Sequence, residues 1–190
     1  MAPHWGPTTK GEHMKNIKSL QARLHASDIQ RWHTARTIKS QSVGEHTYRA
    51  LQLLRYIAYP LDLSSNTIFA MLDHDVPEVV TGDVPFSAKR EHSELKFAVD
   101  AVESIVRLEF EARYDLTPEL KSLIKQADLL EMAYFGLEEA NLGNKFGGHV
   151  IHNIINALMQ LQEGSGIPLS NRTVKLIELI SIEIGAEVKV

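Results

Sequence analysis

The sequence of 190 residues contains no cysteine. This absence excludes a disulfide scaffold, a zinc ribbon held by thiolates and a thiol nucleophile. The sequence also has no run of the roughly 18–20 apolar residues that cross a membrane, and no apolar signal-peptide region near its start. We therefore expect a cytoplasmic protein without a membrane partner.

A strong excess of charge of either sign is missing as well. The 20 Lys and Arg residues against 24 Asp and Glu residues give a formal net charge of −4, which argues against the basic surface that nucleic-acid binding needs. The hydrophobic share of 44% and the charged share of 23% are those of an ordinary folded domain. Because one domain takes about 150 residues, we expect a single domain and no nucleic-acid partner.

The first 13 residues differ from the rest of the chain. They show no helical spacing of apolar residues and hold two of the seven prolines. The pair His13-Met14 resembles the junction that a cloning site leaves at a start codon. We predict an expression tag or linker over residues 1–13 and one domain over residues 14–190.

Alternating patterns typical of β-strands are almost absent, whereas apolar residues recur at the three- and four-residue spacing of helices. Thr117-Pro118 is typical of a helix start, and Gly82 and Gly143 of helix ends. The expected helices cover approximately residues 17–24, 45–59, 66–74, 91–113, 118–141, 148–162 and 170–184, with a single turn near 77–82. The sequence therefore predicts an all-α domain, a bundle of about seven helices.

Four residues have the types and positions of metal ligands: His46, His74, Asp75 and Asp128. Imidazole and carboxylate groups suit zinc, manganese, cobalt or iron. Asp128 interrupts the apolar pattern of a predicted helix, where a buried carboxylate is costly unless it is paired or binds a cation. Taken one at a time, such residues are more often helix caps or solvated positions than metal ligands, so the meaning of the set depends on the neighbouring motifs.

A competing histidine pair, His149 and His152, has the i, i+3 spacing that brings two side chains to one helical face. No acidic residue lies beside the pair at the spacing of an HExxH motif, and glycines come directly before it. We favour a helix start over a metal site at this position.

Five short motifs follow one another along the chain. They are Arg31-Trp32, Gly44-Glu45-His46, His74-Asp75-Val76-Pro77-Glu78, Thr81-Gly82-Asp83 and Lys125-Gln126-Ala127-Asp128. In this order the sequence resembles the HD-domain metal-dependent phosphohydrolases, in particular the YfbR-like 5'-deoxynucleotidases and the phage dATP triphosphohydrolases related to them. The resemblance covers about residues 29–139 and implies a single HD-domain helical bundle. It also implies that His46, His74, Asp75 and Asp128 are the metal ligands, with a divalent Zn, Co, Mn or Mg ion as cofactor.

The resemblance assigns two further carboxylates to the reaction. Glu78 would act as the general acid or base, and Asp83 would bind the substrate at the 3'-hydroxyl of the sugar. A bound metal activates water and polarises a phosphoryl oxygen, but the reaction still needs a proton donor or acceptor beside it. The alternative for Glu78 is a carboxylate that only stabilises the N-terminus of a short helix.

Phosphate binding requires cations, and three basic residues lie in or near the motifs: Arg31, Lys89 and Lys125. Lys125 shares a helical face with Asp128 three residues later, and an arginine can bind phosphate through two parallel hydrogen bonds. Trp32 offers a flat apolar surface for a base or a deoxyribose. The alternatives are a solvated surface charge for Lys89 and core packing for Trp32.

Together with these residues, the resemblance implies a metal-dependent deoxynucleotide phosphohydrolase. Because three cations exceed what a monophosphate requires, we favour hydrolysis of dATP at the α-phosphorus, which releases deoxyadenosine and triphosphate; only the resemblance to the phage enzymes supplies the adenine. The alternatives are a 5'-deoxynucleotidase that converts a dNMP to deoxynucleoside and phosphate, and a catalytically silent HD-fold nucleotide-binding module. The resemblance further implies a homo-oligomer, either a dimer or a hexamer, and the apolar last helix favours a subunit contact there.

Overall fold

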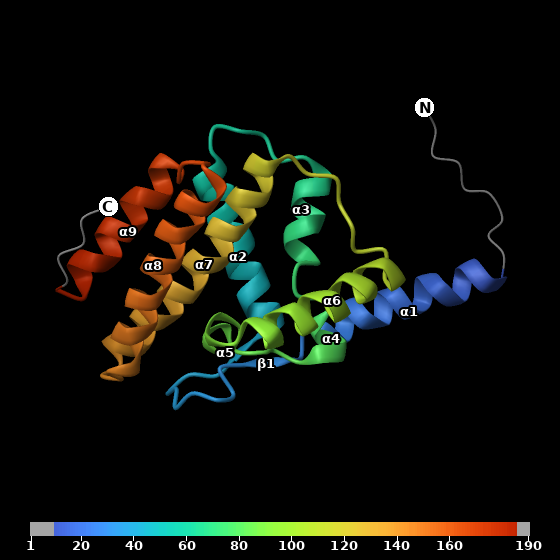
Figure 1. Cartoon of the computed structure of the whole chain (residues 1–190), viewed down its shortest axis with the longest axis horizontal. Coiled ribbons are helices and arrows are strands. Elements are labelled where there is room, and N and C mark those ends of the chain that lie inside the picture. The colour runs from blue at the N-terminus through green and yellow to red at the C-terminus, as the bar shows by residue number, and fades with distance from the viewer. Residues whose placement is uncertain (1–9, 186–190) are drawn as a thin grey trace.

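The computed structural model describes residues 10–185, with side chains described from residue 16 onward, and this part of the chain is almost entirely helical (Figure 1). The helices are α1 (Lys10–Ala26), α2 (Val43–Ala58), α3 (Ser65–Leu72), α4 (Glu78–Thr81), α5 (Phe86–Glu91), α6 (Ser93–Glu109), α7 (Pro118–Asn141), α8 (Phe146–Ser165) and α9 (Asn171–Glu183). The all-α prediction is confirmed. Within the described residues, seven helices have eight residues or more, and the short helices α4 and α5 are additional. None of the helices in this range is long and apolar enough to span a bilayer.

The predicted tag falls mostly outside this range. Residues 1–9 lie outside the described part, and residues 10–13 belong to the first turn of α1. The boundary between residues 13 and 14 stays a prediction.

Hydroxyl side chains begin three of the helices within one residue of the predicted starts. Ser64, Thr117 and Ser170 precede α3, α7 and α9, and each side-chain oxygen accepts a hydrogen bond from the backbone N–H three residues later, at 3.3, 3.3 and 3.1 Å. Such an oxygen satisfies one of the N–H groups that the first turn of a helix leaves unpaired. Gly82, with a φ of 69°, ends α4 in a conformation that favours glycine.

Helix α7 forms the centre of the molecule. It contacts α2, α3, α8 and α9, and almost every residue from 126 to 137 is buried. A Cβ atom on Gly147 would collide with the carbonyl oxygen of Gly136, so glycine allows α8 to approach α7 closely here. Because α7 is surrounded by other helices, its polar side chains need partners inside the protein.

A second group of helices, α1, α4 and α6, lies beside this bundle, on the right in Figure 1. A small apolar cluster joins α1 to the segment that carries α4. Asp73, at the end of α3, accepts hydrogen bonds from Arg23 of α1, whose Nη2 lies 2.7 Å from Oδ2. This contact ties α1 to the chain directly before His74 and Asp75.

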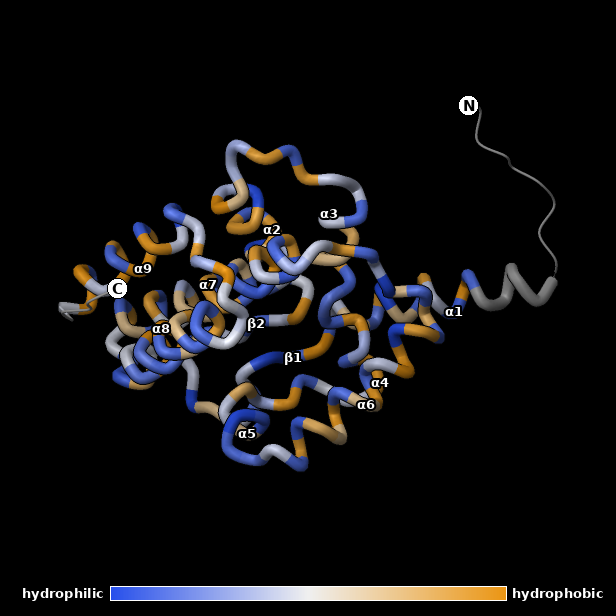
Figure 2. The backbone as a smooth tube through the Cα atoms, turned by 45° about the horizontal axis from the view of Figure 1, so that its top comes forward, coloured by the Kyte–Doolittle hydropathy of each residue, from blue (hydrophilic) through white to orange (hydrophobic). Residues whose placement is uncertain are grey.

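Several helices keep apolar side chains exposed, α1, α6 and α9 among them. In Figure 2 hydrophobic and hydrophilic segments alternate along α1 and α9. Ile17, Leu20 and Leu24 of α1 are 50–59% exposed, and Leu179 and Ile182 of α9 are 51% and 74% exposed. Patches of this kind occur at contacts between subunits.

A two-stranded hairpin lies between the first two predicted helices, where the sequence predicts no regular element. Strand β1 (Gln30–Arg31) pairs antiparallel with β2 (Gln41–Ser42), so that Arg31 is opposite Gln41. The buried carboxylate of Glu139 on α7 accepts two hydrogen bonds of 2.8 Å from backbone N–H groups of the hairpin loop, which fixes the loop against the bundle. Strands of two residues are too short to produce an alternating sequence pattern.

Candidate metal centre

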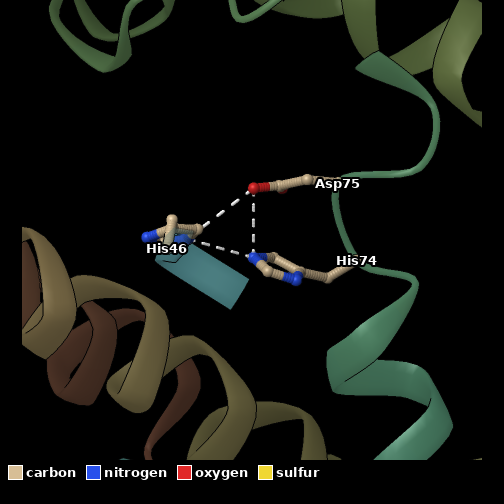
Figure 3. A group of neighbouring side chains, drawn as sticks. All are labelled: His46, His74 and Asp75. Carbon is tan, nitrogen blue, oxygen red and sulfur yellow. Dashed lines mark hydrogen bonds and ion pairs between the residues drawn. The ribbon is translucent and has the colours of Figure 1, made fainter. Parts of the chain in front are cut away.

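Three of the predicted ligands meet at one point (Figure 3). His46 lies on α2, whereas His74 and Asp75 follow the end of α3. His46 Nε2 lies 3.2 Å from His74 Nε2 and 3.6 Å from Asp75 Oδ2, and His74 Nε2 lies 3.2 Å from the same oxygen. Atoms that share one zinc ion at about 2.0–2.2 Å lie roughly 3–3.5 Å apart, so this spacing suits a single divalent cation.

The fourth predicted ligand, Asp128, lies on α7 beside His46, next to the three residues whose ligand atoms all lie within 4.8 Å of one another. Its Oδ1 lies 3.2 Å from His46 Nε2, although the two residues are 82 positions apart in the sequence. Its Oδ2 accepts a hydrogen bond of 2.6 Å from Lys125 Nζ, one helical turn earlier. We call His46, His74, Asp75 and Asp128 the metal cluster; its two nitrogens and its carboxylate oxygens fit the donor set of Zn, Co or Mn.

Neighbouring charges hold the two carboxyl groups of the metal cluster in the form that binds cations. Burial raises the pKa of Asp75, but its interactions with His74 and with the Arg31 guanidinium outweigh this effect and lower the pKa below its usual range. Burial likewise raises the pKa of Asp128, but Lys125 and His46 lower it well below the usual range. Both side chains are therefore carboxylates at neutral pH.

The pKa of the His46 imidazole is raised, whereas the pKa values of Asp75 and Asp128 are lowered. Burial and the nearby Arg31 lower its pKa, but hydrogen bonds to Asp128 and Glu131 outweigh them and raise the pKa to about 9. A cation that binds Nε2 therefore has to displace a proton, which makes metal affinity depend on pH.

Glu131 is a site residue that the sequence analysis missed. It lies on α7 and is fully buried, and its Oε2 is 2.6 Å from His46 Nδ1. Its other oxygen accepts from Gln41 Nε2 at 2.8 Å and pairs with Arg49 Nε at 3.1 Å. Glu131 follows Asp128 by three residues, so the shared helical face was a signal that could have found it.

His74 is fixed from its backbone side. Its Nδ1 lies 2.6 Å from the carbonyl oxygen of Met71, which directs Nε2 into the metal cluster. Its own carbonyl oxygen accepts hydrogen bonds of 3.1 and 2.9 Å from the two terminal nitrogens of Arg107 on α6. The sequence around Arg107 carries no motif, and this role follows only from the fold.

Arg31 bridges the metal cluster and the space beside it. Its side chain is only 8% exposed, and its Nη1 donates to Asp75 Oδ2 at 3.1 Å. Burial lowers the pKa of Arg31, but Asp75, Asp83 and Asp128 outweigh this effect and raise it. Its Nε is buried and has no hydrogen-bond partner among the described residues. An unpaired buried donor of this kind is expected where a ligand completes the site.

Glu78 begins α4 and is 6% exposed. Burial and the negative charges of Asp75 and Asp83 raise its pKa to about 9. Its Oε2 is buried without a hydrogen-bond partner among the described residues. Glu78 is therefore a protonated, unpaired carboxyl group at neutral pH. A residue that only stabilises a helix start needs neither property.

The structure gives Trp32 two environments. Its ring stacks on Phe135 with the ring centroids 4.8 Å apart and the planes 6° apart, and it meets Phe146 edge-on at 6.2 Å. Its Nε1 donates to Gln41 Oε1 at 2.9 Å. Trp32 also lines the large cavity of the site, so it both packs against the core and faces the cavity.

A cavity of about 1230 Å³ collects the predicted site residues. Those that line it are Arg31, Trp32, His74, Asp75, Glu78, Asp83, Lys89, Lys125 and Asp128. His46 lies behind them and is fully buried. Ligand cavities usually measure roughly 300–1,000 Å³, so there is room for a nucleotide with its phosphates.

The competing histidine pair lies on α8. His149 and His152 are exposed, and His152 Nε2 lies 3.2 Å from the side-chain nitrogen of Asn156. Neither histidine belongs to a group of three potential metal ligands within the described residues. The preference for a helix start near this pair agrees with α8, which begins at Phe146.

Comparisons with known proteins identify the family of the chain. The fold and the metal cluster define an HD-domain protein of the metal-dependent phosphohydrolase class. A family model described as "5'-deoxynucleotidase YfbR-like" matches residues 19–166. The chain belongs to this family, which confirms the resemblance inferred from the motifs.

Curated relatives are named for two reactions. A dATP triphosphohydrolase of Acinetobacter phage SH-Ab 15497 is 34% identical over 165 residues, which cover 75% of this chain and 77% of that protein. A 5'-deoxynucleotidase of Cronobacter sakazakii is 28% identical over 138 residues, 61% of this chain and 69% of that protein. Both relatives are hydrolases, and the prediction of an enzyme is confirmed.

Solved structures share the fold. The cyanophage S-2L HD phosphohydrolase DatZ, bound to dA and one catalytic Zn²⁺ ion, gives a TM-score of 0.62 at 24% identity and covers 87% of this chain and 95% of its own. A conserved hypothetical protein from Pyrococcus furiosus gives 0.65 at 21% identity, with 87% and 99% covered. These matches extend over most of the chain and support the HD-domain fold.

Proposed function

We propose that the protein hydrolyses dATP at the α-phosphorus and releases deoxyadenosine and triphosphate. The observation that carries the proposal is the metal cluster at the wall of a cavity that also contains the protonated carboxyl group of Glu78. The phage relative named dATP triphosphohydrolase supports the choice of substrate. His46, His74, Asp75 and Asp128 would hold one divalent ion, which supplies Lewis acidity and lowers the pKa of water when it is bound.

Glu78 provides the proton that the leaving group needs. A water oxygen forms the new bond to the α-phosphorus while the bond from that phosphorus to the 5'-oxygen breaks. The 5'-oxygen leaves as an alkoxide unless it receives a proton, and Glu78 Oε2, which lacks a hydrogen-bond partner among the described residues, supplies it. The carboxylate that remains takes up the proton from the attacking water, so the group returns to its starting form.

The order of residues along α7 supports one orientation of the nucleotide. Lys121, Lys125, Asp128 and Met132 line the cavity and recur at intervals of three and four residues, on one face of the helix. Lys121 and Lys125 are separated by roughly 6 Å along the axis. This order, two cations followed by a metal-cluster carboxylate and an apolar residue, favours an orientation with the outer phosphates towards the start of α7.

The nucleoside would then lie towards the other end of the cavity. Trp32, Phe146 and Val150 line the cavity there and offer apolar surface for the base. Asp83 binds the 3'-hydroxyl of the sugar, and Arg31, with Lys89, binds the α-phosphate. The unpaired Nε of Arg31 supports its part in this arrangement.

Separation of the products by anion-exchange chromatography tests the reaction. The protein is incubated with dATP and added Mn²⁺ or Co²⁺, and we expect deoxyadenosine with intact triphosphate. Release of dADP and orthophosphate would contradict attack at the α-phosphorus. Nucleotide binding without any product would favour the catalytically silent module.

A second candidate is hydrolysis of dNMPs to deoxynucleoside and phosphate. The matching family model and the bacterial relatives support it, because both are described as 5'-deoxynucleotidases. The same metal cluster and Glu78 would serve this reaction, since it breaks the same bond. Activity confined to dNMPs in the product assay would establish this alternative.

We also infer a homo-oligomer, either a dimer or a hexamer. The exposed apolar residues Leu179 and Ile182 on α9, together with Ile17, Leu20 and Leu24 on α1, support contacts between subunits. Light scattering coupled to gel filtration gives the number directly, and a monomer at micromolar concentration would contradict the inference. The cytoplasmic location stays a prediction from the sequence.

A further inference from the structure

Trp32 has an unusual backbone conformation. Its φ is 61°, in the left-handed region that bulky residues rarely adopt. Trp32 directly follows β1, whose last residue, Arg31, is paired with Gln41 in the hairpin. Such a conformation persists only where the surroundings fix it, and it is frequent at functional sites. Stacking on Phe135 holds the ring, but it does not explain why the residue should be a tryptophan.

A chain of hydrogen bonds connects the indole N–H to His46, and chemistry fixes its direction. An indole N–H can only donate, so the oxygen of the Gln41 amide must face Trp32, at 2.9 Å. The amide nitrogen of Gln41 is thereby turned towards Glu131 and donates to Oε1 at 2.8 Å. Glu131 Oε2, 2.6 Å from His46 Nδ1, accepts the ring proton. In the neutral imidazole the proton therefore sits on Nδ1, and the lone pair of Nε2 faces the metal cluster.

Because this chain of hydrogen bonds is buried, its donors and acceptors are all side chains of the protein. Gln41 is 1% exposed, and His46 and Glu131 are 0% exposed. Solvent does not reach these side chains to replace a lost donor, and Glu131 Oε1 would keep only its ion pair with Arg49 Nε, at 3.1 Å. If the indole N–H were removed, the Gln41 amide could rotate by half a turn and bring its oxygen against the carboxylate of Glu131. That rotation would weaken the contact that orients His46.

We propose that Trp32 is a positioning residue for the metal ion, in addition to any contact with the substrate. It acts through Gln41 and Glu131, which hold the Nε2 lone pair of His46 towards the site of the cation. The inference rests on the proposed metal cluster but not on the identity of the nucleotide. It gives one hairpin two tasks, because Arg31 bonds to Asp75 on one side and Gln41 supports His46 through Glu131 on the other.

The Zn²⁺ affinity of the full chain without nucleotide tests the proposal. It is measured by competition with a chromophoric chelator for the wild type, Trp32→Phe, Gln41→Leu and the double variant. Phenylalanine keeps the stacking ring but lacks the N–H. We expect Trp32→Phe to weaken Zn²⁺ binding about threefold or more, less than the roughly 10–100-fold loss that removal of a direct partner such as Glu131 causes.

The double variant separates positioning from general packing. If Trp32 acts through Gln41, Trp32→Phe should have no further effect once Gln41 is leucine. Phe146→Leu is the matched control, since it removes an aromatic neighbour of Trp32 and leaves the hydrogen-bond chain intact; its Zn²⁺ affinity should match the wild type. Circular dichroism checks that each variant is folded.

Two results would overturn the inference. One is a Trp32→Phe variant that binds Zn²⁺ as tightly as the wild type. The other is an equal loss from Trp32→Phe with and without Gln41. If the wild type binds neither Zn²⁺, Mn²⁺ nor Co²⁺, the proposed function fails together with the inference. If the wild type binds metal and hydrolyses dATP while Trp32→Phe is unaffected, only the inference fails.

Discussion

The two sides of the cavity wall differ in how completely their polar groups are paired. On the metal side, His46, His74 and Asp128 each have a partner within hydrogen-bonding distance, and Glu131 behind them accepts on both oxygens. On the substrate side, Arg31 Nε and Glu78 Oε2 are buried without a partner among the described residues. A buried polar atom left in this state costs about 1–3 kcal/mol.

This difference corresponds to two roles, binding of a cation and binding of the substrate. Paired groups are held in one geometry before any ligand arrives, which suits a site that must accept a cation with fixed distances. Unpaired groups gain a partner only when a ligand enters the cavity, so they can contribute more to a bound substrate or transition state than to the free protein. The predictions below test whether metal binding and turnover divide along this line.

Asp128→Ala should produce the largest effect, because it removes a residue of the metal cluster. The variant loses a charged ligand and leaves Lys125 without its partner. We expect elemental analysis to find little bound metal, and activity to disappear with it. Asp62→Ala removes an exposed aspartate and serves as the control. Equal metal content in Asp128→Ala and the wild type would count against the assignment.

Glu78→Gln should lower turnover without affecting metal binding. Glutamine keeps the size of the side chain but cannot donate a carboxyl proton, so we expect kcat to fall by about 10²–10⁴-fold. Metal content should stay at the wild-type value, since Glu78 is not in the metal cluster. Glu163→Gln, at an exposed position on α8, is the matched control. A variant with more than about a tenth of the wild-type kcat would reduce Glu78 to a helix-start residue.

Asp83→Asn should have a smaller effect, mainly on binding. A hydrogen bond to a charged acceptor contributes about 1.5–3 kcal/mol, so loss of the charge should raise KM for dATP by about tenfold or more. The preference for dATP over ATP should also decrease, because the contact positions the sugar. Steady-state kinetics with both nucleotides measures the two effects. An unchanged preference would remove Asp83 from the sugar site.

A further effect concerns stability rather than activity and follows from the raised pKa of Glu78. The pKa is about 9 in the folded protein and 4.5 for the unperturbed group. Between these values the folded chain keeps a proton that the unfolded chain has released, so this group lowers stability as pH rises, by at most about 1.4 kcal/mol per pH unit. In the chelator-treated protein, Glu78→Gln should therefore gain stability over the wild type at pH 8 compared with pH 5. Urea unfolding at both values measures the difference, and an equal difference at the two values would contradict the raised pKa.

The sequence predicted those features that have local signals. Thr117, followed by Pro118, marked a helix start because a cap depends on the hydrogen bond to a residue three positions later. The residues of the metal cluster were found because they lie in short motifs whose order is specific, although 82 residues separate His46 from Asp128. Only the fold shows that these motifs meet.

Features that depend on distant partners escaped the sequence analysis. Glu131 resembles any glutamate on a helix until α2 brings His46 beside it. Arg107 donates to the backbone carbonyl oxygen of His74. Every residue has such an oxygen, so the sequence does not indicate this contact. The alternatives for Trp32, base stacking or core packing, were too simple, because the ring lies on Phe135 and still lines the cavity.

Hydrolysis of dATP in water enriched in ¹⁸O tests the central claim most directly. Water that attacks the α-phosphorus, with Glu78 protonating the 5'-oxygen, places one ¹⁸O atom in the released triphosphate and none in deoxyadenosine. Mass spectrometry of the separated products therefore should find the label only in triphosphate. Label in deoxyadenosine would contradict the account because the bond to the 5'-carbon would have broken, and so would labelled orthophosphate formed together with dADP.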